Sequence, residues 1–522
     1  MNAVDPPTPP ARSAEGEPAN LYTLLDGLPF ADTTDVVVSE SGRLSLGELR
    51  GRAHALAETL REAGVAPGHP VGNLVAPGPS SIVVMFAVWA VGAVYVPINR
   101  RFTSGEISSF LAETPVALIV GAPIDLDAHS IPIGVVEHDY LPSRSAVRVP
   151  ADPATPRYEP DVAFVLRTSG TTGRPKAVLL RHSGTLDALD ASLEKLRPSG
   201  RSRSADARRH RMSLIPLSLA LWAGIFNVLF TFRSGSGIVL LDTFTPAGFA
   251  DAVRVHEMTS TVLPPAMITM ITDADDIDDL TPLRFVRSIT APLSPDVARQ
   301  FHERFGVFVL NCYGQTELGG EVVGWTSQDV RDFGLDKLGA AGRAYDQVDL
   351  RIRAEDGSDA SVGELGEIYV RSPFRMRGYA FSSGDLDGSG EDRFVDGYLR
   401  TGDIGRVDND GFLWVLGRVG DMINRGGLKI YPDEVEEALR RHPSVRDAGV
   451  AAVPDRRLGE VPHAWVVTTG DLDPDELQAW CRQHLAPYKV PTGFTRVESL
   501  PRSDVGKLLR NDLVAEFRVT NA

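Results

Sequence analysis

Nine consecutive residues of the chain combine the side chains that a polyphosphate group requires. They are Thr168, Ser169, Gly170, Thr171, Thr172, Gly173, Arg174, Pro175 and Lys176. Glycines let backbone N–H groups approach phosphate oxygens, hydroxyl groups donate further hydrogen bonds, and a lysine offsets negative charge. The lysine does not directly follow Gly173, so the spacing differs from the Gly-x4-Gly-Lys-Ser/Thr of P-loop NTPases. The stretch predicts nucleotide binding in another fold, and an ordinary surface turn is the alternative.

A short apolar run leads into this phosphate loop. Residues 162–166 read Val-Ala-Phe-Val-Leu, which is typical of a buried strand. Similar runs recur at 71–75, 95–98, 117–120, 177–180, 212–215, 238–241, 261–263, 285–289 and 307–310. Helical patterns lie between them, with a Ser-x-x-Glu capping box at Ser45 and a Ser-Pro helix start at Ser294. The alternation predicts α/β architecture, with parallel sheets covered by helices on both faces.

The pattern changes beyond about Ala341. Glycine-containing hairpin signals at 354–357 and 408–411 separate short strands and predict a small antiparallel or barrel-like subdomain. An amphipathic helix from Asp433, strands at 447–453 and 464–468, and a helix at 474–485 predict a compact α+β end. We therefore expect a disordered tail over 1–20, an N-terminal domain over 21–417 and a C-terminal domain over 418–522.

Composition limits the partners and the compartment. The 522 residues carry a formal net charge of −16, which argues against nucleic acid or an anionic membrane as the main partner. Only two cysteines occur, Cys312 and Cys481, so a disulfide framework or a cysteine metal site is excluded and a reducing cytoplasm is expected. The uncharged stretch 82–98 contains Gly92 and Pro97 and predicts a buried helix and strand rather than a membrane span.

Five further motifs accompany the phosphate loop. They are Asn-Cys-Tyr-Gly-Gln-Thr-Glu at 311–317, Gly-Glu-Leu-Gly-Glu at 363–367, Tyr-Leu-Arg-Thr-Gly-Asp at 398–403, Gly-Arg at 417–418 and Pro-Arg-Ser-Asp-Val-Gly-Lys at 501–507. In their order and approximate spacing they resemble the adenylate-forming superfamily, in particular its acyl- and aryl-CoA ligase branch. The resemblance implies a large N-terminal domain followed by a small mobile C-terminal domain. It also implies ATP, Mg²⁺ and CoA, or the phosphopantetheine of a carrier protein, as cofactors.

The resemblance assigns roles to residues. Thr168 to Gly173 and Lys176 would bind the β- and γ-phosphates of ATP, Thr316 would bind the α-phosphate, and Glu317 would bind Mg²⁺. Tyr313 would lie on the adenine face, Asp403 would bind the ribose, and Arg418 would contact the ribose or a phosphate. Ala291 and Gly314 would complete the nucleotide site. Lys507 would bridge the attacking carboxylate and the α-phosphate, so the catalytic set is Lys507, Thr316 and Glu317. In isolation, Asp403 could be a turn residue, Lys507 a solvated side chain and Tyr313 part of the core.

The second half-reaction of the family passes the acyl group to a thiol. There the small domain rotates about a hinge just after the Gly-Arg pair, and here the hinge position is Gly420. Gly426 and Gly427 would then lie beside the pantetheine arm. A simple turn ahead of the Asp433 helix is the alternative for this pair.

The acid is less clearly encoded. Ser218 and Leu219 replace the aromatic-histidine pair that relatives commonly carry, and no acidic residue lies between Pro216 and Phe230 to pair with an amino group. These departures favour a bulky hydrophobic, cyclic carboxylic acid over an amino acid or a salicylate-like acid. The candidate pocket residues are Leu219, Trp222, Leu263, Met267 and Thr290, with Ala291 and Gly314 as further candidates, each equally explicable as core packing.

The sequence thus predicts an AMP-forming acyl-CoA ligase. A stand-alone ligase that loads a carrier protein is the first alternative, and a luciferase-like oxygenase is the second. A basic cluster between Arg197 and Arg211 fits a solvated loop, or an anion-binding lip for CoA or for an acidic carrier protein.

Overall fold

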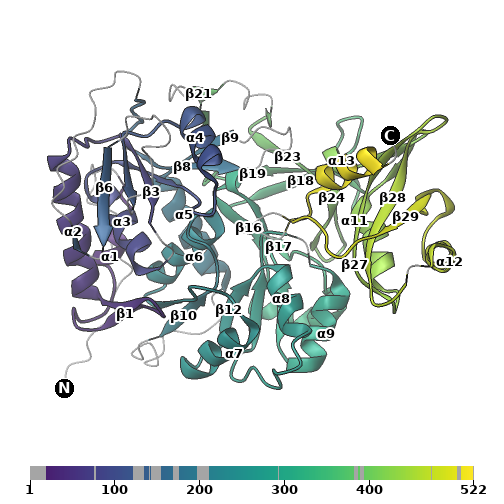
Figure 1. Cartoon of the computed structure of the whole chain (residues 1–522), viewed down its shortest axis with the longest axis horizontal. Helices are drawn as coiled ribbons and strands as arrows, with labels where there is room; N and C mark the ends of the chain where they lie inside the picture. Colours follow the sequence, from purple (N-terminus) through teal and green to yellow (C-terminus); the bar gives the residue numbers. More distant parts are fainter. Residues whose placement is uncertain are drawn as a thin grey trace.

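The computed structural model describes most of the chain. The described residues are 19–75, 78–121, 134–139, 141–142, 155–168, 176–196, 211–291, 293–380, 386–387, 393–471, 473–502 and 507–520. A large N-terminal part, from purple to green in Figure 1, lies beside a smaller C-terminal part in green and yellow. The predicted division into a large α/β domain with parallel sheets and a small C-terminal α+β domain is confirmed.

The largest sheet carries the predicted phosphate loop. Within the described residues its strands, in spatial order, are β21 (Leu386–Asp387), β20 (Gly378–Ala380), β9 (Lys176–Arg181), β8 (Val162–Thr168), β4 (Val94–Pro97), β3 (Pro70–Leu74), β5 (Leu118–Gly121), β6 (Gly134–Asp139) and β7 (Leu141–Pro142). β8, β4, β3, β5 and β6 are parallel, whereas β9 is antiparallel to β8. Because a connection between parallel strands needs a dozen or more residues, the seven residues 169–175 are too few to join β8 and β9 in parallel. The short connection therefore explains why these two strands are antiparallel.

A second, four-stranded sheet lies on the far side of a helical layer. It contains β10 (Met212–Ile215), β11 (Gly237–Leu240), β1 (Asp35–Ser39) and β2 (Gly42–Ser45). The helices of this half are α1 (Thr23–Asp26), α2 (Leu46–Glu62), α3 (Pro79–Ala90), α4 (Ser104–Glu113), α5 (His182–Leu196) and α6 (Trp222–Arg233). α3 contacts strands of both sheets.

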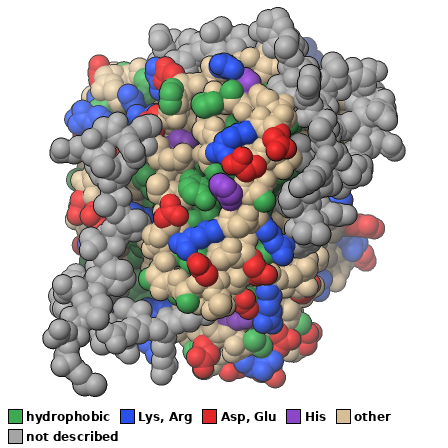
Figure 2. All heavy atoms as spheres, turned by 90° about the vertical axis from the view of Figure 1, so that its left-hand side faces the viewer, with side chains coloured by type: hydrophobic (Ala, Val, Ile, Leu, Met, Phe, Trp, Pro, Cys, Tyr) green, Lys and Arg blue, Asp and Glu red, His purple; other side chains and the backbone are tan. Residues whose placement is uncertain are grey.

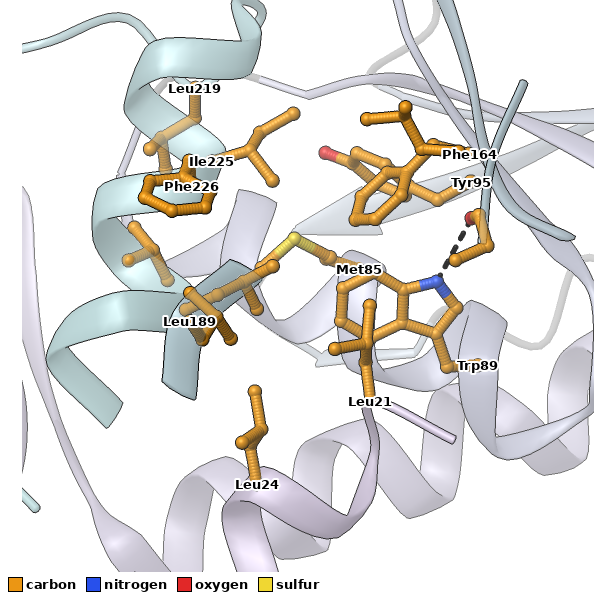
Figure 3. Packing of buried hydrophobic residues seen from close by; sticks show 14 of the residues in the cluster. Leu21, Leu24, Met85, Trp89, Tyr95, Phe164, Leu189, Leu219, Ile225 and Phe226 are labelled. Atoms are coloured by element: carbon orange, nitrogen blue, oxygen red, sulfur yellow. Dashed lines mark hydrogen bonds between the residues drawn. The ribbon is translucent and has the colours of Figure 1, made fainter. Parts of the chain in front are cut away.

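The apolar segment 82–98 is explained by this burial. α3 is apolar on all sides and its side chains from Ser81 to Trp89 are buried, as expected of a helix between two sheets. Figure 3 shows Trp89 against Phe164 and Tyr95, with the indole N–H donating to the Ala163 carbonyl oxygen at 3.1 Å. No helix of the described residues is long and apolar enough to cross a membrane.

Local signals position several helices as predicted. Ser45 caps α2 in a capping box with Glu48, and the side chain of Ser294 caps α9. α9 (Pro295–Phe305) belongs to a third layer with α7 (Pro246–Val255), α8 (Pro265–Thr272) and the parallel strands β12 (Ser260–Leu263), β13 (Phe285–Ser288) and β14 (Phe308–Asn311).

Antiparallel strands follow, as the hairpin signals predict. A small sheet contains β15 (Tyr313–Gln315), β16 (Gly320–Gly324) and β17 (Arg343–Ala344), with the short helices η3 (Thr316–Leu318), α10 (Ser327–Phe333) and η4 (Gly334–Lys337). A five-stranded sheet contains β18 (Asp349–Arg353), β19 (Gly366–Arg371), β22 (Phe394–Val395), β23 (Tyr398–Val407) and β24 (Leu413–Arg418).

The C-terminal part has its own sheet and core. Its elements are η6 (Val419–Asp421), β25 (Ile423–Arg425), β26 (Leu428–Ile430), α11 (Pro432–Arg440), β27 (Val445–Asp455), β28 (Gly459–Thr468), α12 (Pro474–His484), η7 (Pro487–Lys489), β29 (Gly493–Arg496) and α13 (Arg510–Thr520). Ile423, Val435, Leu439 and Cys481 form a cluster separate from the core around Trp89. The expected boundary between 417 and 418 falls at the last residue of β24 and stays a prediction.

The surface agrees with an acidic protein of mixed charge. Figure 2 shows the face at the left of Figure 1, where acidic and basic side chains are interspersed over its described part. The predicted tail 1–20 lies outside the described residues except for Ala19 and Asn20.

Candidate active site

A buried carboxylate forms the centre of the candidate site. Asp403 is 5% exposed, and its Oδ2 accepts hydrogen bonds from the Tyr313 hydroxyl at 2.8 Å and from Gln315 Nε2 at 2.6 Å. Its other oxygen lies 2.9 Å from Nε of Arg418. The Tyr313 hydroxyl comes from 90 residues away. The structure therefore brings three predicted nucleotide-binding residues, Asp403, Tyr313 and Arg418, into contact.

The backbone around Asp403 is fixed by its neighbours. Gly402 adopts a φ of 75°, in the left-handed region that favours glycine. The hydroxyl group of Thr401 accepts from the Asp403 N–H and donates to the Ile368 carbonyl oxygen on β19. The Thr-Gly-Asp motif thus turns the carboxylate of β23 toward β15.

Glu317 lies beside the end of the phosphate loop. The side chain of Glu317 is mostly buried, and its Oε1 accepts from the Tyr379 hydroxyl at 3.0 Å and from Arg393 at 3.5 Å. The Lys176 ammonium lies 4.8 Å from the centroid of the same Tyr379 ring. Burial and the Glu317 charge raise the pKa of Tyr379, so its hydroxyl stays protonated and donates to the carboxylate.

Glu317 has the chemistry of a Mg²⁺ ligand. Oε1 is engaged by Tyr379 and Arg393, while Oε2 accepts no hydrogen bond from the described residues. No group of three or more histidine, cysteine or acidic side chains gathers as a metal cage in the described part of the chain. Magnesium commonly uses one or two carboxylates and takes its other ligands from water and substrate phosphates. A single glutamate beside a phosphate loop fits that pattern.

The phosphate loop itself is described only at its ends. Thr168 closes β8 and is paired in register with Lys176, the first residue of β9. Ser169, Gly170, Thr171, Thr172 and Gly173 lie outside the described residues. Lys176, one described end of the loop, lies beside Tyr379, whose hydroxyl group donates to Glu317.

Lys507 reaches this region from the C-terminal domain. The side chain of Lys507 is partly buried and interacts electrostatically with Arg418, Asp403 and Asp421. Burial is the largest cause that lowers the Lys507 pKa, the Arg418 guanidinium is the second, and the two carboxylates oppose them. The lysine of the small domain therefore lies close enough to Asp403 and Arg418 for their charges to act on it. Its action on a transition state stays a prediction.

The candidate acid-pocket residues divide between two cores. Leu219 and Trp222 pack in the cluster around Trp89, and Figure 3 shows Leu219 beside Ile225 and Phe226. Leu263 and Met267 belong instead to the core of the β12 layer. The Trp222 ring meets Phe164 edge-on, and its indole N–H is buried without an acceptor among the described residues.

The remaining candidates lie at strand ends. Thr290 follows β13 with a φ of 74°, a left-handed conformation that is uncommon for a β-branched residue, and Ala291 follows it. Gly314 lies on β15 so close to β16 that an added Cβ would lie 2.1 Å from the Gly320 carbonyl oxygen. Thr316 begins η3, one residue before Glu317.

The thiol-side candidates form a tight turn. Gly426 and Gly427 join β25 to β26 with φ values of 59° and 92°, which only glycine adopts at low cost in a two-residue hairpin. The Gly427 N–H donates to the Asn424 side chain. Gly420 lies in η6, and a Cβ there would meet nothing within 4 Å. The turn explains the glycine pair structurally, and its pantetheine role and the Gly420 hinge stay predictions.

A buried ion pair near the candidate pocket was not predicted from the sequence. Arg287 on β13 donates to Glu321 on β16 at 2.9 Å and to Asn227 on α6 at 2.9 Å. The Tyr345 hydroxyl donates to the other Glu321 oxygen at 2.8 Å. The Arg287 and Glu321 side chains are 13% and 11% exposed. Arg287 thus connects β13 to α6, which begins at Trp222, and to β16, which pairs with the strand of Gly314.

Three further residues of the candidate site, Gln315, Tyr379 and Arg393, were not predicted from the sequence. Gln315 stands inside the 311–317 motif, so its neighbours could have indicated its role. Tyr379 and Arg393 contact Glu317 from 62 and 76 residues away, and nothing in their local sequence marks them. The cluster between Arg197 and Arg211 lies outside the described residues except for Arg211.

Comparison with family models decides the affiliation. The AMP-binding enzyme model matches residues 30–380, and the model of the AMP-binding enzyme C-terminal domain matches residues 434–507. The chain belongs to the AMP-binding enzyme family. The predicted resemblance to adenylate-forming enzymes is confirmed, and with it the assignment to the AMP-forming acyl-CoA ligases.

Relatives of this AMP-binding enzyme cover nearly its whole length. Feruloyl-CoA synthase of an Amycolatopsis species is 32% identical over 493 residues, 91% of this chain and 94% of the relative. A fatty acid–acyl-carrier-protein ligase of Streptomyces coeruleorubidus is 29% identical over 517 residues, 95% of this chain and 97% of the relative. The structure of o-succinylbenzoate coenzyme A synthetase of Bacillus subtilis with ATP and magnesium ion has a TM-score of 0.81 at 26% identity, covering 95% of this chain and 99% of that one. These comparisons support the expected use of ATP, Mg²⁺ and CoA.

Proposed function

We propose that the protein activates a cyclic, hydrophobic carboxylic acid as its acyl-AMP and then transfers the acyl group to CoA. In the first step a carboxylate oxygen attacks the α-phosphorus of ATP and pyrophosphate leaves. In the second step the sulfur of CoA attacks the acyl carbon, AMP leaves and the thiol proton is released. The observation that carries this proposal is the convergence of Lys507 with Asp403 and Arg418, because it joins the two domains at one polar site.

Each group of site residues has a role in this scheme. Asp403 accepts hydrogen bonds from the ribose hydroxyls, and Tyr313 borders the adenine. Lys176 and the phosphate loop hold the leaving pyrophosphate, while Thr316 contacts the α-phosphate. Glu317 would be the protein ligand of Mg²⁺, which would neutralise phosphate charge when bound. Lys507 supplies a positive charge between the attacking carboxylate and the α-phosphate.

The buried pair Arg287 and Glu321 supports a neutral acid side chain. Because the two charges satisfy each other, a second charged group on the acid would find no unpaired counterion there. The Trp222 indole N–H is buried and lacks an acceptor among the described residues, so it favours an acid with a neutral oxygen substituent. A ring carrying an ether or hydroxyl group meets both conditions. The similarity to feruloyl-CoA synthase agrees with this class.

A panel of acids tests the substrate class. Pyrophosphate release is measured with ATP and substituted cinnamic, benzoic, long-chain fatty, dicarboxylic and α-amino acids. We expect the highest kcat/KM for a neutral substituted aromatic acid. Preference for a dicarboxylic or amino acid would overturn the acid class while leaving adenylation intact.

The thiol acceptor is tested separately. Acyl-AMP is incubated with CoA or with a phosphopantetheinyl carrier protein, and the thioester is followed by mass spectrometry. We expect acyl-CoA, and exclusive loading of the carrier would favour the alternative that the Streptomyces relative represents. Oxygen-dependent product formation would favour a luciferase-like oxygenase. We place the reaction in the cytoplasm, where ATP and CoA are available and the two cysteines stay reduced.

A further inference from the structure

An arginine-lined cavity lies at the opposite end of β9 from Lys176. It has a volume of about 630 Å³, and its walls include Arg181, Arg371, Arg375, Asp346 and Gln347. Arg181 ends β9, five residues after Lys176, so the two positions are roughly 16 Å apart along the strand. The Arg181 end of the cavity is therefore distant from Lys176, whereas Arg375 directly precedes Met376, whose N–H donates to the Glu317 carbonyl oxygen at 2.9 Å.

Two of these guanidinium groups lack a carboxylate partner. Arg181 makes one long hydrogen bond, from Nη2 to the Pro373 carbonyl oxygen at 3.4 Å, and its Nε is buried without an acceptor among the described residues. Arg375 donates to the Gly397 carbonyl oxygen and stacks on the Phe394 ring at 4.5 Å. Among the described residues, no acidic side chain lies within ion-pair distance of either group.

The two charges act on each other. Burial is the main cause that lowers the Arg375 pKa, and the like charge of Arg181 is the second. Two cations held together in a partly buried cavity are unfavourable unless an anion joins them. Arg371 differs, since it pairs with Asp349 at 2.7 Å.

The cavity also contains acceptors. The Asp346 carboxylate lies in its wall and makes no ion pair within 4.0 Å in the described part of the chain, and the Gln347 amide donates to Glu194 at its rim. An inorganic anion alone would leave the Asp346 side of the cavity unused. A ligand that carries a phosphate at one end and hydroxyl groups at the other satisfies both sides. The volume falls in the range of small-molecule sites, which is about 300–1,000 Å³.

We propose that Arg181 and Arg375 form a second anion site, distinct from the nucleotide site, which binds a small sugar phosphate. The guanidinium groups hold the phosphate, and Asp346 accepts hydrogen bonds from the sugar hydroxyls. This site does not depend on the proposed acid or thiol acceptor. It goes beyond the adenylation chemistry, since neither arginine contacts the Asp403 or Glu317 clusters.

Calorimetric titration of the full chain with ribose 5-phosphate tests the site. The nucleotide site also attracts phosphates, so the titration is repeated in a Lys176→Gln variant, which is expected to keep the binding. Arg181→Gln and Arg375→Gln are each expected to weaken it at least about tenfold, as the loss of a charged hydrogen bond implies. Arg254→Gln removes an exposed arginine on α7 and serves as the matched control.

Three results would overturn the proposal. The first is unchanged affinity in Arg181→Gln and Arg375→Gln, and the second is loss of binding in Lys176→Gln alone. The third is equal affinity for inorganic phosphate and ribose 5-phosphate, which would remove the role of Asp346. Folding is checked by the thermal midpoint and by pyrophosphate release, which Arg181→Gln is expected to leave unchanged. Arg181→Lys keeps the charge and is expected to retain part of the binding.

Discussion

The ammonium of Lys176 lies over the ring of Tyr379, whose hydroxyl group donates to the Glu317 carboxylate. One aromatic side chain thus separates the lysine of the phosphate loop from the predicted metal ligand. The Tyr379 ring lies between the Lys176 ammonium and the Glu317 carboxylate, whose Oε1 also lies 3.5 Å from Arg393.

Tyr379→Phe tests this arrangement. The variant keeps the ring and removes the hydroxyl, so Glu317 loses one hydrogen bond and is free to move toward Lys176. We expect acyl-AMP formation to fall about 10- to 100-fold, the effect of losing a hydrogen bond to a charged group, with a raised Mg²⁺ requirement. Both the rate of acyl-AMP formation and its Mg²⁺ requirement are measured from pyrophosphate release at a series of Mg²⁺ concentrations. Tyr369→Phe, on the half-exposed face of β19, is the control. An unaltered Mg²⁺ dependence would contradict the role of Tyr379.

Lys507→Ala is expected to separate the two half-reactions. Loss of a charge aimed at the transition state typically costs about 10²- to 10³-fold, so pyrophosphate release should fall by that amount. Conversion of supplied acyl-AMP and CoA to thioester should stay near the wild-type rate. Equal loss of both steps would argue that the lysine only stabilises the fold.

The lowered pKa of Lys507 predicts a pH dependence. A lysine with a depressed pKa loses its proton, and thus its charge, at a lower pH than the ordinary value of 10.5. Adenylation should therefore decline on the alkaline side before free lysines titrate. Lys507→Arg keeps its charge at those pH values, so whatever activity it retains should not show this decline. Identical alkaline limbs in both proteins would contradict the assignment.

His182 predicts acid sensitivity of the large domain. Its imidazole is 2% exposed, accepts the Leu21 N–H at 3.1 Å, and burial lowers its pKa to about 4. Below pH 6.5 the His182 imidazole is protonated in the unfolded chain but stays neutral in the folded protein until the pH approaches 4. The stabilising contribution is complete above pH 6.5 and is lost as the pH falls toward 4, by about 3 kcal/mol in all. His182→Gln keeps an acceptor and does not titrate, so its thermal midpoint should fall less over this range than that of the wild type.

The Arg287 and Glu321 pair predicts a non-additive pair of substitutions. Glu321→Ala leaves a buried guanidinium unpaired and should cost about 3–5 kcal/mol of unfolding free energy. Replacing both residues by hydrophobic ones, as in Arg287→Met with Glu321→Leu, should cost much less. Denaturant unfolding of the single and double variants measures the difference. A loss in the double variant that equals the sum of the losses in the two single variants would show that the pair is not coupled.

Sequence reasoning succeeded where the signal is local. The capping box of Ser45 and Glu48 and the Ser294 helix start depend on residues three or fewer positions apart, and the structure contains both. Motif order located Tyr313 and Asp403, which lie in contact. The partners of Glu317 and the Arg287 pair could not be predicted, because each contact joins residues from separate strands with no spacing rule between them. The division of Leu219 and Leu263 between two cores is likewise set by packing, because both are simply apolar in the sequence.

Separate cores in the two domains have a consequence for biosynthesis. The strands that carry Asp403 and Arg418 complete the sheet of the large domain before the C-terminal core around Ile423 begins. Domains generally fold in the order in which they leave the ribosome. If Lys507 acts on the α-phosphate as we propose, a nascent chain that has formed the Asp403 and Arg418 cluster would still not adenylate an acid until Lys507 has been translated and docked.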